Sequence, residues 1–282
     1  MKFDSKPLNI LSCLSRFSIF ILAFPLVAFA GLPQSSNVPG GLAIIPLASV
    51  ANTGKPQAWL GDQPVLVTSD NEVWYAVVGL ALNTTLGSHE LRFITDSATL
   101  VQQFTVESKD YPEQRIKLKN KSKVELSATD LARAESELSV IIGLKQVWRA
   151  VPDNDLDFIL PAQGEMSSRF GLRRFFNEQP RAPHAGLDLA VERGTPVKAS
   201  APGTVLATDD YFFNGKTVFI DHGNGLLTMY CHLDKFEVKV GQTVSKGQLI
   251  GLSGETGRAT GPHLHWSVML NGAMVDPELF VQ

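Results

Sequence analysis

Gly261-Pro262-His263-Leu264-His265-Trp266-Ser267 places two histidines two positions apart, at the start of an apolar run that ends at Asn271-Gly272. An apolar run closed by Asn-Gly predicts a β-strand, and positions i and i+2 of a strand face the same side. Two imidazoles on one side of a sheet cost desolvation unless something binds them. A divalent metal ion is the economical partner. Because an HxH triplet alone is a weak motif, two solvated histidines remain the alternative.

His184-Ala185-Gly186-Leu187-Asp188 offers a further imidazole and a carboxylate four positions apart. Pro183 just before it, and the alternation of apolar and small or polar residues through Val191, favour a strand with His184 and Asp188 on its polar face. These two residues and a histidine of the HxH pair would make the three-ligand set of a catalytic zinc site, which leaves a fourth position for water. The sequence therefore predicts a zinc site built from distant segments.

A zinc hydrolase also needs a group that takes a proton from metal-bound water and a donor for the oxyanion. The HExxH motif, which supplies a glutamate for this purpose in other zinc peptidases, does not occur in the chain. His263 is the member of the HxH pair that is not needed once His184, Asp188 and His265 are taken as ligands. His232, at the end of the apolar run 227–230, and His263 are therefore the expected acid/base pair. His222, in a glycine-rich turn, is expected to be structural or exposed.

The composition is that of a globular protein, with 282 residues, 44% hydrophobic and 19% charged. This length is enough for one or two domains with real cores. The net charge is −3 and the basic residues are scattered. A nucleic-acid partner is therefore not expected, because such proteins carry a basic patch.

The first thirty residues resemble a targeting segment. Lys2, Lys6 and Arg16 precede an apolar run that ends at Ala28-Phe29-Ala30. A basic region, an apolar stretch and small residues at a cleavage position predict a signal peptide over residues 1–30. The apolar run is short for a transmembrane span, so an uncleaved anchor is the less favoured alternative. The expected product is an exported protein, periplasmic or associated with the cell wall, without a membrane span after cleavage.

The period of the apolar residues divides the remaining chain into three parts. Over 31–125, short alternating runs separated by turns roughly every 8–12 residues predict a β-sandwich N-terminal domain. Over 126–156, Leu131, Ala134 and Leu138 change to helical spacing, with Ser127 as N-cap and Gly143 as a stop, which predicts a helical linker. Over 157–282, dense turn signals predict an antiparallel β domain. The expected fold class is mainly β.

Several motifs in the last part occur in the order found in a known family. Together they resemble the lysostaphin-like (LytM-type) zinc metallopeptidases, which cut peptide cross-links in bacterial peptidoglycan. By this resemblance His184, Asp188 and His265 are the zinc ligands, His232 and His263 are catalytic histidines, and 157–282 is a zinc metallopeptidase domain. The motifs are Ser168-Arg169-Phe170-Gly171, His184-Ala185-Gly186-Leu187-Asp188, Gly194-Thr195-Pro196-Val197, His222-Gly223-Asn224-Gly225, Tyr230-Cys231-His232-Leu233 and Gly261-Pro262-His263-Leu264-His265.

Tyr111-Pro112-Glu113-Gln114-Arg115-Ile116 is similar to the end of the β-sandwich N-terminal domain of some exported members. Such a domain could occlude the cleft, orient the enzyme on the wall or bind a regulatory protein partner. The expected function is a zinc-dependent endopeptidase that hydrolyses amide bonds in stem or cross-link peptides of peptidoglycan. The alternatives are a catalytically silent regulator or wall-binding partner of another wall hydrolase, and a periplasmic module that only sequesters metal.

Overall fold

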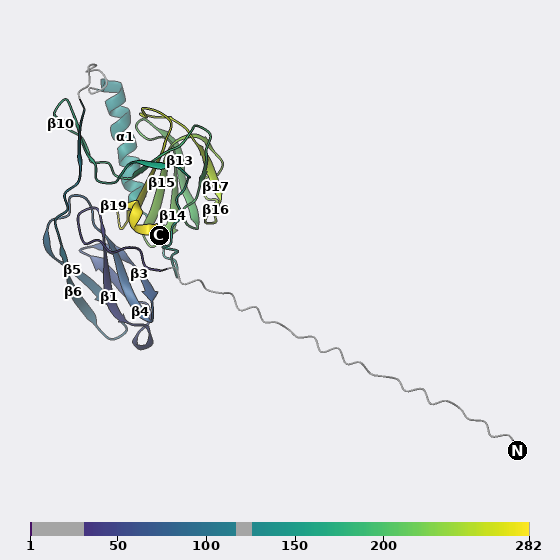
Figure 1. Ribbon diagram of the computed structural model, residues 1–282. Coiled ribbons are helices and arrows are strands. Elements are labelled where there is room, and N and C mark those ends of the chain that lie inside the picture. Colours follow the sequence, from purple (N-terminus) through teal and green to yellow (C-terminus); the bar gives the residue numbers. More distant parts are fainter. Residues whose placement is uncertain (2–30, 117–125, 282) are drawn as a thin grey trace.

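The computed structural model describes residue 1, residues 31–116 and residues 126–281 (Figure 1). The predicted signal peptide therefore lies almost entirely outside the described residues. Within the described part of the chain, no helix combines the length and the apolar character that crossing a bilayer requires.

The N-terminal part forms an antiparallel sheet in the order β1-β4-β3-β2-β5-β6. Its apolar cluster draws on both halves of the sheet, for example Val78 of β4 and Phe104 of β6. The sheet therefore curls, and its two halves pack face to face as expected for a sandwich. The strands are β1 (Leu42–Ser49), β2 (Gln57–Leu60), β3 (Gln63–Asp70), β4 (Val73–Gly79), β5 (Gly87–Ile94) and β6 (Thr99–Val106), and the 3-10 turn η1 (Val50–Asn52) follows β1.

The strand β7 (Glu113–Ile116) leaves the N-terminal sheet and pairs in parallel with β9 (Arg173–Phe176), which forms a hairpin with β10 (Gln179–Pro180). The ion pair between Glu113 of β7 and Arg173 of β9 supports this pairing. A segment expected to close the N-terminal domain thus builds part of the C-terminal half.

The linking helix α1 (Ala128–Lys145) begins where the sequence predicts, because the Ser127 hydroxyl accepts a hydrogen bond from the backbone N–H of Asp130 at 3.1 Å. The helix continues two residues beyond Gly143, which was predicted to stop it. The helix lies beside the C-terminal sheet (Figure 1). Ile141 and Leu144 pack against an apolar cluster of this sheet.

The C-terminal part is an antiparallel sheet in the order β16-β13-β14-β15-β18-β11-β8, as its dense turn signals predict. The strand β15 is central because it pairs with β14, β17 and β18. The elements are β8 (Glu165–Ser168), β11 (Leu187–Ala190), β12 (Pro196–Lys198), β13 (Gly203–Tyr211), β14 (Gly215–Gly223), β15 (Leu226–Phe236), β16 (Thr243–Val244), β17 (Leu249–Ser253), β18 (Leu264–Leu270), β19 (Ala273–Val275) and the 3-10 turn η3 (Pro277–Phe280).

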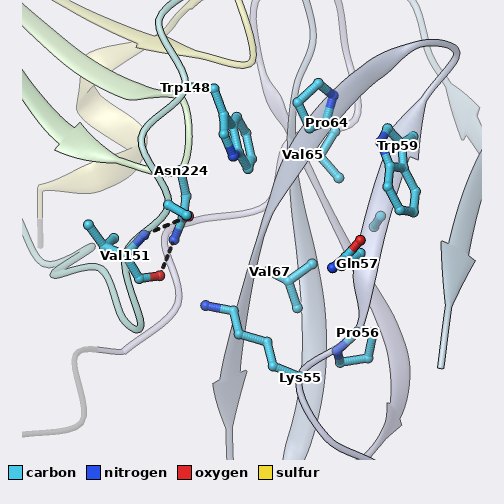
Figure 2. Close-up of a pocket in the computed structure, with 12 residues that line it drawn as sticks. Lys55, Pro56, Gln57, Trp59, Pro64, Val65, Val67, Trp148, Val151 and Asn224 are labelled. Atoms are coloured by element: carbon cyan, nitrogen blue, oxygen red, sulfur yellow. Dashed lines mark hydrogen bonds between the residues drawn. The ribbon is translucent and has the colours of Figure 1, made fainter. Parts of the chain in front are cut away.

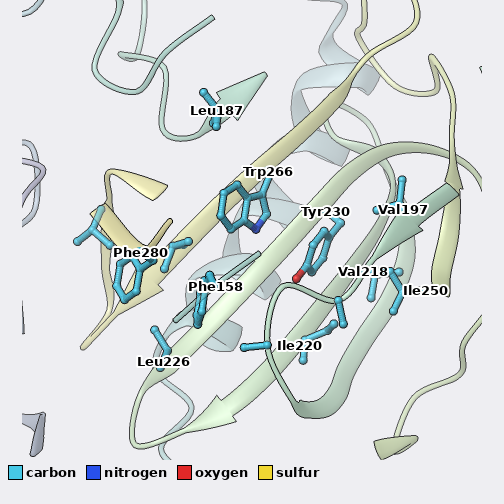
Figure 3. Packing of buried hydrophobic residues seen from close by; sticks show 14 of the residues in the cluster. Phe158, Leu187, Val197, Val218, Ile220, Leu226, Tyr230, Ile250, Trp266 and Phe280 are labelled. Atoms are coloured by element: carbon cyan, nitrogen blue, oxygen red, sulfur yellow. The ribbon is translucent and has the colours of Figure 1, made fainter. Parts of the chain in front are cut away.

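Alternation along the central strands gives this sheet two apolar faces. Tyr230 of β15 lies with Trp266 and Phe158 in the main core (Figure 3). Met229 and Phe219 belong to the cluster beneath α1. Burying each large apolar side chain stabilises the fold by about 1.5–3 kcal/mol. Burial on both faces keeps β15 and β18 rigid. His232 lies on β15, His265 lies on β18, and His263 directly precedes β18.

The N-terminal sheet and the C-terminal part share apolar packing. Leu42, Leu66 and Val77 belong to the same buried cluster as Trp266. Asn271, in the turn after β18, accepts a hydrogen bond from the backbone N–H of Gly79 at 2.7 Å and donates one to its carbonyl at 3.1 Å. This side chain therefore extends the backbone pairing of β4 across the boundary between the two parts.

The bridge made by Asn271 gives a prediction for stability. Asn271 has φ +42°, so Asn271→Gly keeps the backbone relaxed but removes both hydrogen bonds, and it should lower the free energy of unfolding by about 2–3 kcal/mol. Asn271→Asp keeps only the hydrogen-bond acceptor and should lower the free energy of unfolding by about 1–2 kcal/mol. Urea denaturation measures both values. An unchanged Asn271→Gly midpoint would show that the bridge contributes nothing.

Candidate metal centre

Neighbouring strands bring a carboxylate and an imidazole together. In the pairing of β11 with β18, Asp188 lies directly opposite His265. Gly186 lies beneath the His265 ring, where an added Cβ would approach ring atoms to 2.6 and 2.7 Å. Only glycine leaves room for the imidazole there. His184 precedes β11 in a loop, so the prediction that it shares a strand with Asp188 was wrong, although its ring reaches the same point.

Three potential ligand atoms form a tight triangle. His184 Nε2 lies 2.9 Å from Asp188 Oδ1 and 3.0 Å from His265 Nδ1, and the His265 Nδ1 to Asp188 Oδ1 distance is 2.8 Å. His184 and Asp188 are buried and His265 is partly buried. The predicted ligand residues therefore come together in the described chain as a compact cluster that could hold a metal ion.

In each ring, the hydrogen-bond partner of the outer nitrogen determines which of the two nitrogens carries the proton. His184 Nδ1 is 2.9 Å from the carbonyl oxygen of Arg169, which can only accept. The Ser267 hydroxyl donates to the carbonyl oxygen of Ala185, so it accepts from His265 Nε2 at 2.9 Å. In both neutral rings the proton therefore points outward and the inner nitrogen presents a lone pair to Asp188.

Two lone pairs and a carboxylate oxygen about 3 Å apart repel one another unless a cation lies between them. Outer hydrogen bonds of this kind also fix the orientation of histidine ligands in metal sites. The residues present thus fit a divalent metal ion with two nitrogen ligands and one oxygen ligand. Zinc suits this set, since it binds histidine and carboxylate in open catalytic sites.

The electrostatics of the cluster keep Asp188 ionised and His265 neutral. Burial acts to raise the pKa of Asp188, but a ring of His184 or His265 that takes up a second proton donates it to the carboxylate, and this hydrogen bond and charge outweigh burial and lower that pKa. Burial lowers the pKa of His265, more than its contact with Asp188 raises it. A neutral imidazole and an ionised carboxylate are the forms that bind metal.

His232 reaches the site through a distortion of β15. The strand continues to Phe236, so the expectation that it ends near His232 was wrong. The pairing with β14 shifts between Tyr230 and Leu233, which leaves an extra residue on β15, and His232 adopts φ +60°. Such bulges redirect a side chain, and positive φ in a residue other than glycine is common at functional sites.

The two predicted catalytic histidines face each other. Their ring centroids are 4.6 Å apart, and the His232 centroid lies 6.2 Å from that of His265. His232 Nδ1 donates to the carbonyl of Thr256 and His263 Nδ1 donates to that of Gly261, both at 2.9 Å. Each ring therefore keeps Nε2 for other partners. Burial lowers the pKa of His232 to about 4, so this ring is a neutral base near pH 7.

Arg174 on β9 was not predicted from the sequence. Its Nη2 donates to the Ser168 hydroxyl at 2.9 Å and lies 3.7 Å from Asp188 Oδ2. Ser168 Oγ is in turn 3.3 Å from His184 Nδ1. The Ser168-Arg169-Phe170-Gly171 motif marked this region, but an arginine six positions later carries no pattern that connects it to the cluster.

His222 lies outside the cluster. It is buried, with Nδ1 2.7 Å from the carbonyl of Pro202 and Nε2 2.8 Å from the Thr228 hydroxyl. Of the two expected roles, the structure supports the structural one. Burial lowers its pKa to about 4, against a smaller opposing effect of the Pro202 hydrogen bond.

His222 gives a prediction for pH dependence. The unfolded chain binds a proton near the ordinary histidine pKa of 6.5, whereas the folded chain resists protonation until about pH 4. Stability should therefore be full above pH 6.5 and decline as the pH falls toward 4. His222→Asn should flatten this decline, although it is less stable at pH 7. Urea denaturation with a chelator present measures both slopes, and equal slopes would contradict the assignment.

A separate cavity of about 450 Å³ lies between the N-terminal sheet and the loop after α1 (Figure 2). Its lining includes Trp59, Lys55, Trp148 and Val151, and none of the cluster residues. Lys55 Nζ donates to the carbonyl of Pro152 across this boundary. The cavity belongs to the junction of the two parts and not to the candidate metal centre.

The fold and the site define a mainly β protein with a two-histidine, one-aspartate cluster suited to a metal ion. Residues 182–277 match peptidase family M23, and residues 35–109 match the peptidase family M23 N-terminal domain. A crystal structure from Pseudomonas aeruginosa assigned to peptidase M23 is 40% identical, with a TM-score of 0.73 over 88% of this chain and 96% of that one. The chain therefore belongs to peptidase family M23, which confirms the family resemblance and the fold class.

Two of the curated relatives each match about two fifths of this chain. The peptidoglycan DD-endopeptidase ShyA of Vibrio cholerae is 49% identical over 112 residues, which are 39% of this chain and 26% of that protein. An uncharacterized metalloprotease of Haemophilus influenzae is 45% identical over 120 residues, which are 42% of this chain and 25% of that protein. The matches thus span about a quarter of the length of these relatives.

Proposed function

We propose that this protein is an exported zinc-dependent endopeptidase that hydrolyses amide bonds in the stem or cross-link peptides of peptidoglycan, outside the cytoplasm. The convergence of His184, Asp188 and His265, with their lone pairs turned inward, carries this proposal. Membership of family M23 and the activity named for ShyA support the substrate class. The division into a sandwich domain (31–125), a helical linker (126–156) and a metallopeptidase domain (157–282) is part of the proposal.

His184, Asp188 and His265 would hold the zinc ion. When bound, zinc polarises the scissile carbonyl and makes a water molecule acidic enough to attack it near neutral pH. The outer hydrogen bonds to Arg169 and Ser267 keep the ligand rings oriented and their inner nitrogens deprotonated.

His232 and His263 would handle the proton and the negative charge. Each ring is fixed through Nδ1 by a backbone carbonyl, so Nε2 can accept a proton from the attacking water and return it to the leaving amine. The ring that holds a proton can donate a hydrogen bond to the oxyanion. Because burial lowers the pKa of His232 to about 4, this ring is neutral near pH 7 and can accept the proton.

The ligand assignment gives the first test. Purified protein should contain about one zinc ion per chain and should release cleaved muropeptides from sacculi. His265→Ala should lose both properties, because a carboxylate and one imidazole are too few ligands. The control is His89→Ala on β5, where His89 bonds to the carbonyl of Thr85; it should keep both. Zinc analysis and mass spectrometry of the digest measure them, and persistent cleavage by His265→Ala would exclude this ligand set.

The acid/base assignment gives the second test. His232→Gln should keep the zinc, because the residue is not a ligand, while kcat falls by about 10²- to 10⁴-fold. Turnover of a purified cross-linked muropeptide, measured beside the zinc content, separates the two effects. A variant that loses zinc in proportion to activity would place His232 among the ligands.

A further inference from the structure

Arg174 lies at the edge of the metal cluster and still reaches solvent. The arginine side chain is 32% exposed, and its guanidinium contacts the side of Asp188 that faces away from His184 and His265. The Nη2 to Asp188 Oδ2 distance of 3.7 Å exceeds hydrogen-bond length. The guanidinium is therefore close to the reacting centre without being bonded to the carboxylate beside it.

The strand that carries Arg174 is held firmly from both sides. In the pairing of β7 with β9, Gln114 lies opposite Arg174, and β10 pairs with the other edge of β9. The neighbouring Arg173 forms an ion pair with Glu113, and the Arg115 guanidinium stacks on Phe175. Because successive strand residues face opposite sides, these contacts leave Arg174 directed toward Ser168 and Asp188.

The local charge favours an anion beside Arg174. A divalent ion held by Asp188 would share the charge of this carboxylate, so ion, carboxylate and guanidinium together would carry net positive charge. A guanidinium presents a planar fork of donors that matches a carboxylate with two parallel hydrogen bonds. A substrate carboxylate near the scissile amide could therefore accept hydrogen bonds from the Arg174 guanidinium.

We propose that Arg174 is a specificity-determining residue that binds a free carboxylate on the carbon bearing the scissile amide nitrogen. This proposal rests on the proposed function and names its substrate class. The protein would cleave amide bonds in which the amine-side residue keeps its α-carboxylate. It would act poorly where that carboxylate is amidated, or where the bond lies within a glycine bridge that has no carboxylate at this position.

Two cross-linked muropeptide dimers test the proposal. They differ only at the amine-side diamino acid, whose α-carboxylate is free in one and a carboxamide in the other. The unmodified protein should favour the free acid by about 10- to 100-fold in kcat/KM, the range expected for hydrogen bonds to a charged group. Arg174→Gln should lower kcat/KM for the free acid by this factor and leave the carboxamide nearly unchanged, with zinc content retained. Arg174→Lys should keep part of the preference.

Arg173→Gln is the matched control, because it removes a charge from the adjacent position of the same strand and should keep the full preference. Equal cleavage of both dimers by the unmodified protein would overturn the proposal, as would an equal loss on both dimers in a folded Arg174→Gln. The latter would make Arg174 a positioning residue for Asp188. If Arg174→Gln does not fold, the proposal is judged from the other two proteins. The unmodified protein must prefer the free-acid dimer over the carboxamide dimer, and Arg174→Lys must keep part of this preference. Failure of the unmodified protein on both dimers and on sacculi would instead overturn the proposed function.

Discussion

The candidate site depends on the register between β11 and β18. This register sets Asp188 opposite His265 and, together with the loop that carries His184, brings three electron-rich atoms within 3.0 Å of one another. Such an arrangement is unfavourable by itself. It persists because the two strands are fixed by a buried apolar core around Trp266 and because the protons of both rings are held outward. The stability of the fold therefore supplies the energy that keeps a cation site open.

The sequence was sufficient to predict which residues form the cluster, but it did not reveal how the backbone brings them together. The HxH spacing was sufficient to predict the strand β18, because the alternation of side chains on a strand is a local property. His184 reaches the cluster from a loop and His232 through a bulge with positive φ. Neither feature follows a repeating pattern, so neither was visible in the sequence. Arg174 was missed because its relation to Asp188 is created by the pairing of distant strands.

The division between the two halves was less visible in the sequence than the strands themselves. Apolar periodicity reveals that a strand has a buried face, but not which partner covers it. Leu42 and Leu66 lie on N-terminal strands, yet they pack in the same cluster as Trp266. The Asn271 side chain adds a polar link to Gly79. The N-terminal part is thus a structural neighbour of the C-terminal core.

The parallel pairing of β7 with β9 has a consequence for dissecting the protein. A cut within α1 would separate β7 from the hairpin that carries Arg174 and leave one backbone edge of β9 uncovered. Uncovered strand edges recruit other chains and promote aggregation. An isolated C-terminal half that begins after the helix would therefore lack the strand that covers β9 and be prone to self-association. The shortest unit that keeps the pairing of β7 with β9 begins before Glu113, well upstream of residue 182, where the match to the peptidase family M23 itself begins.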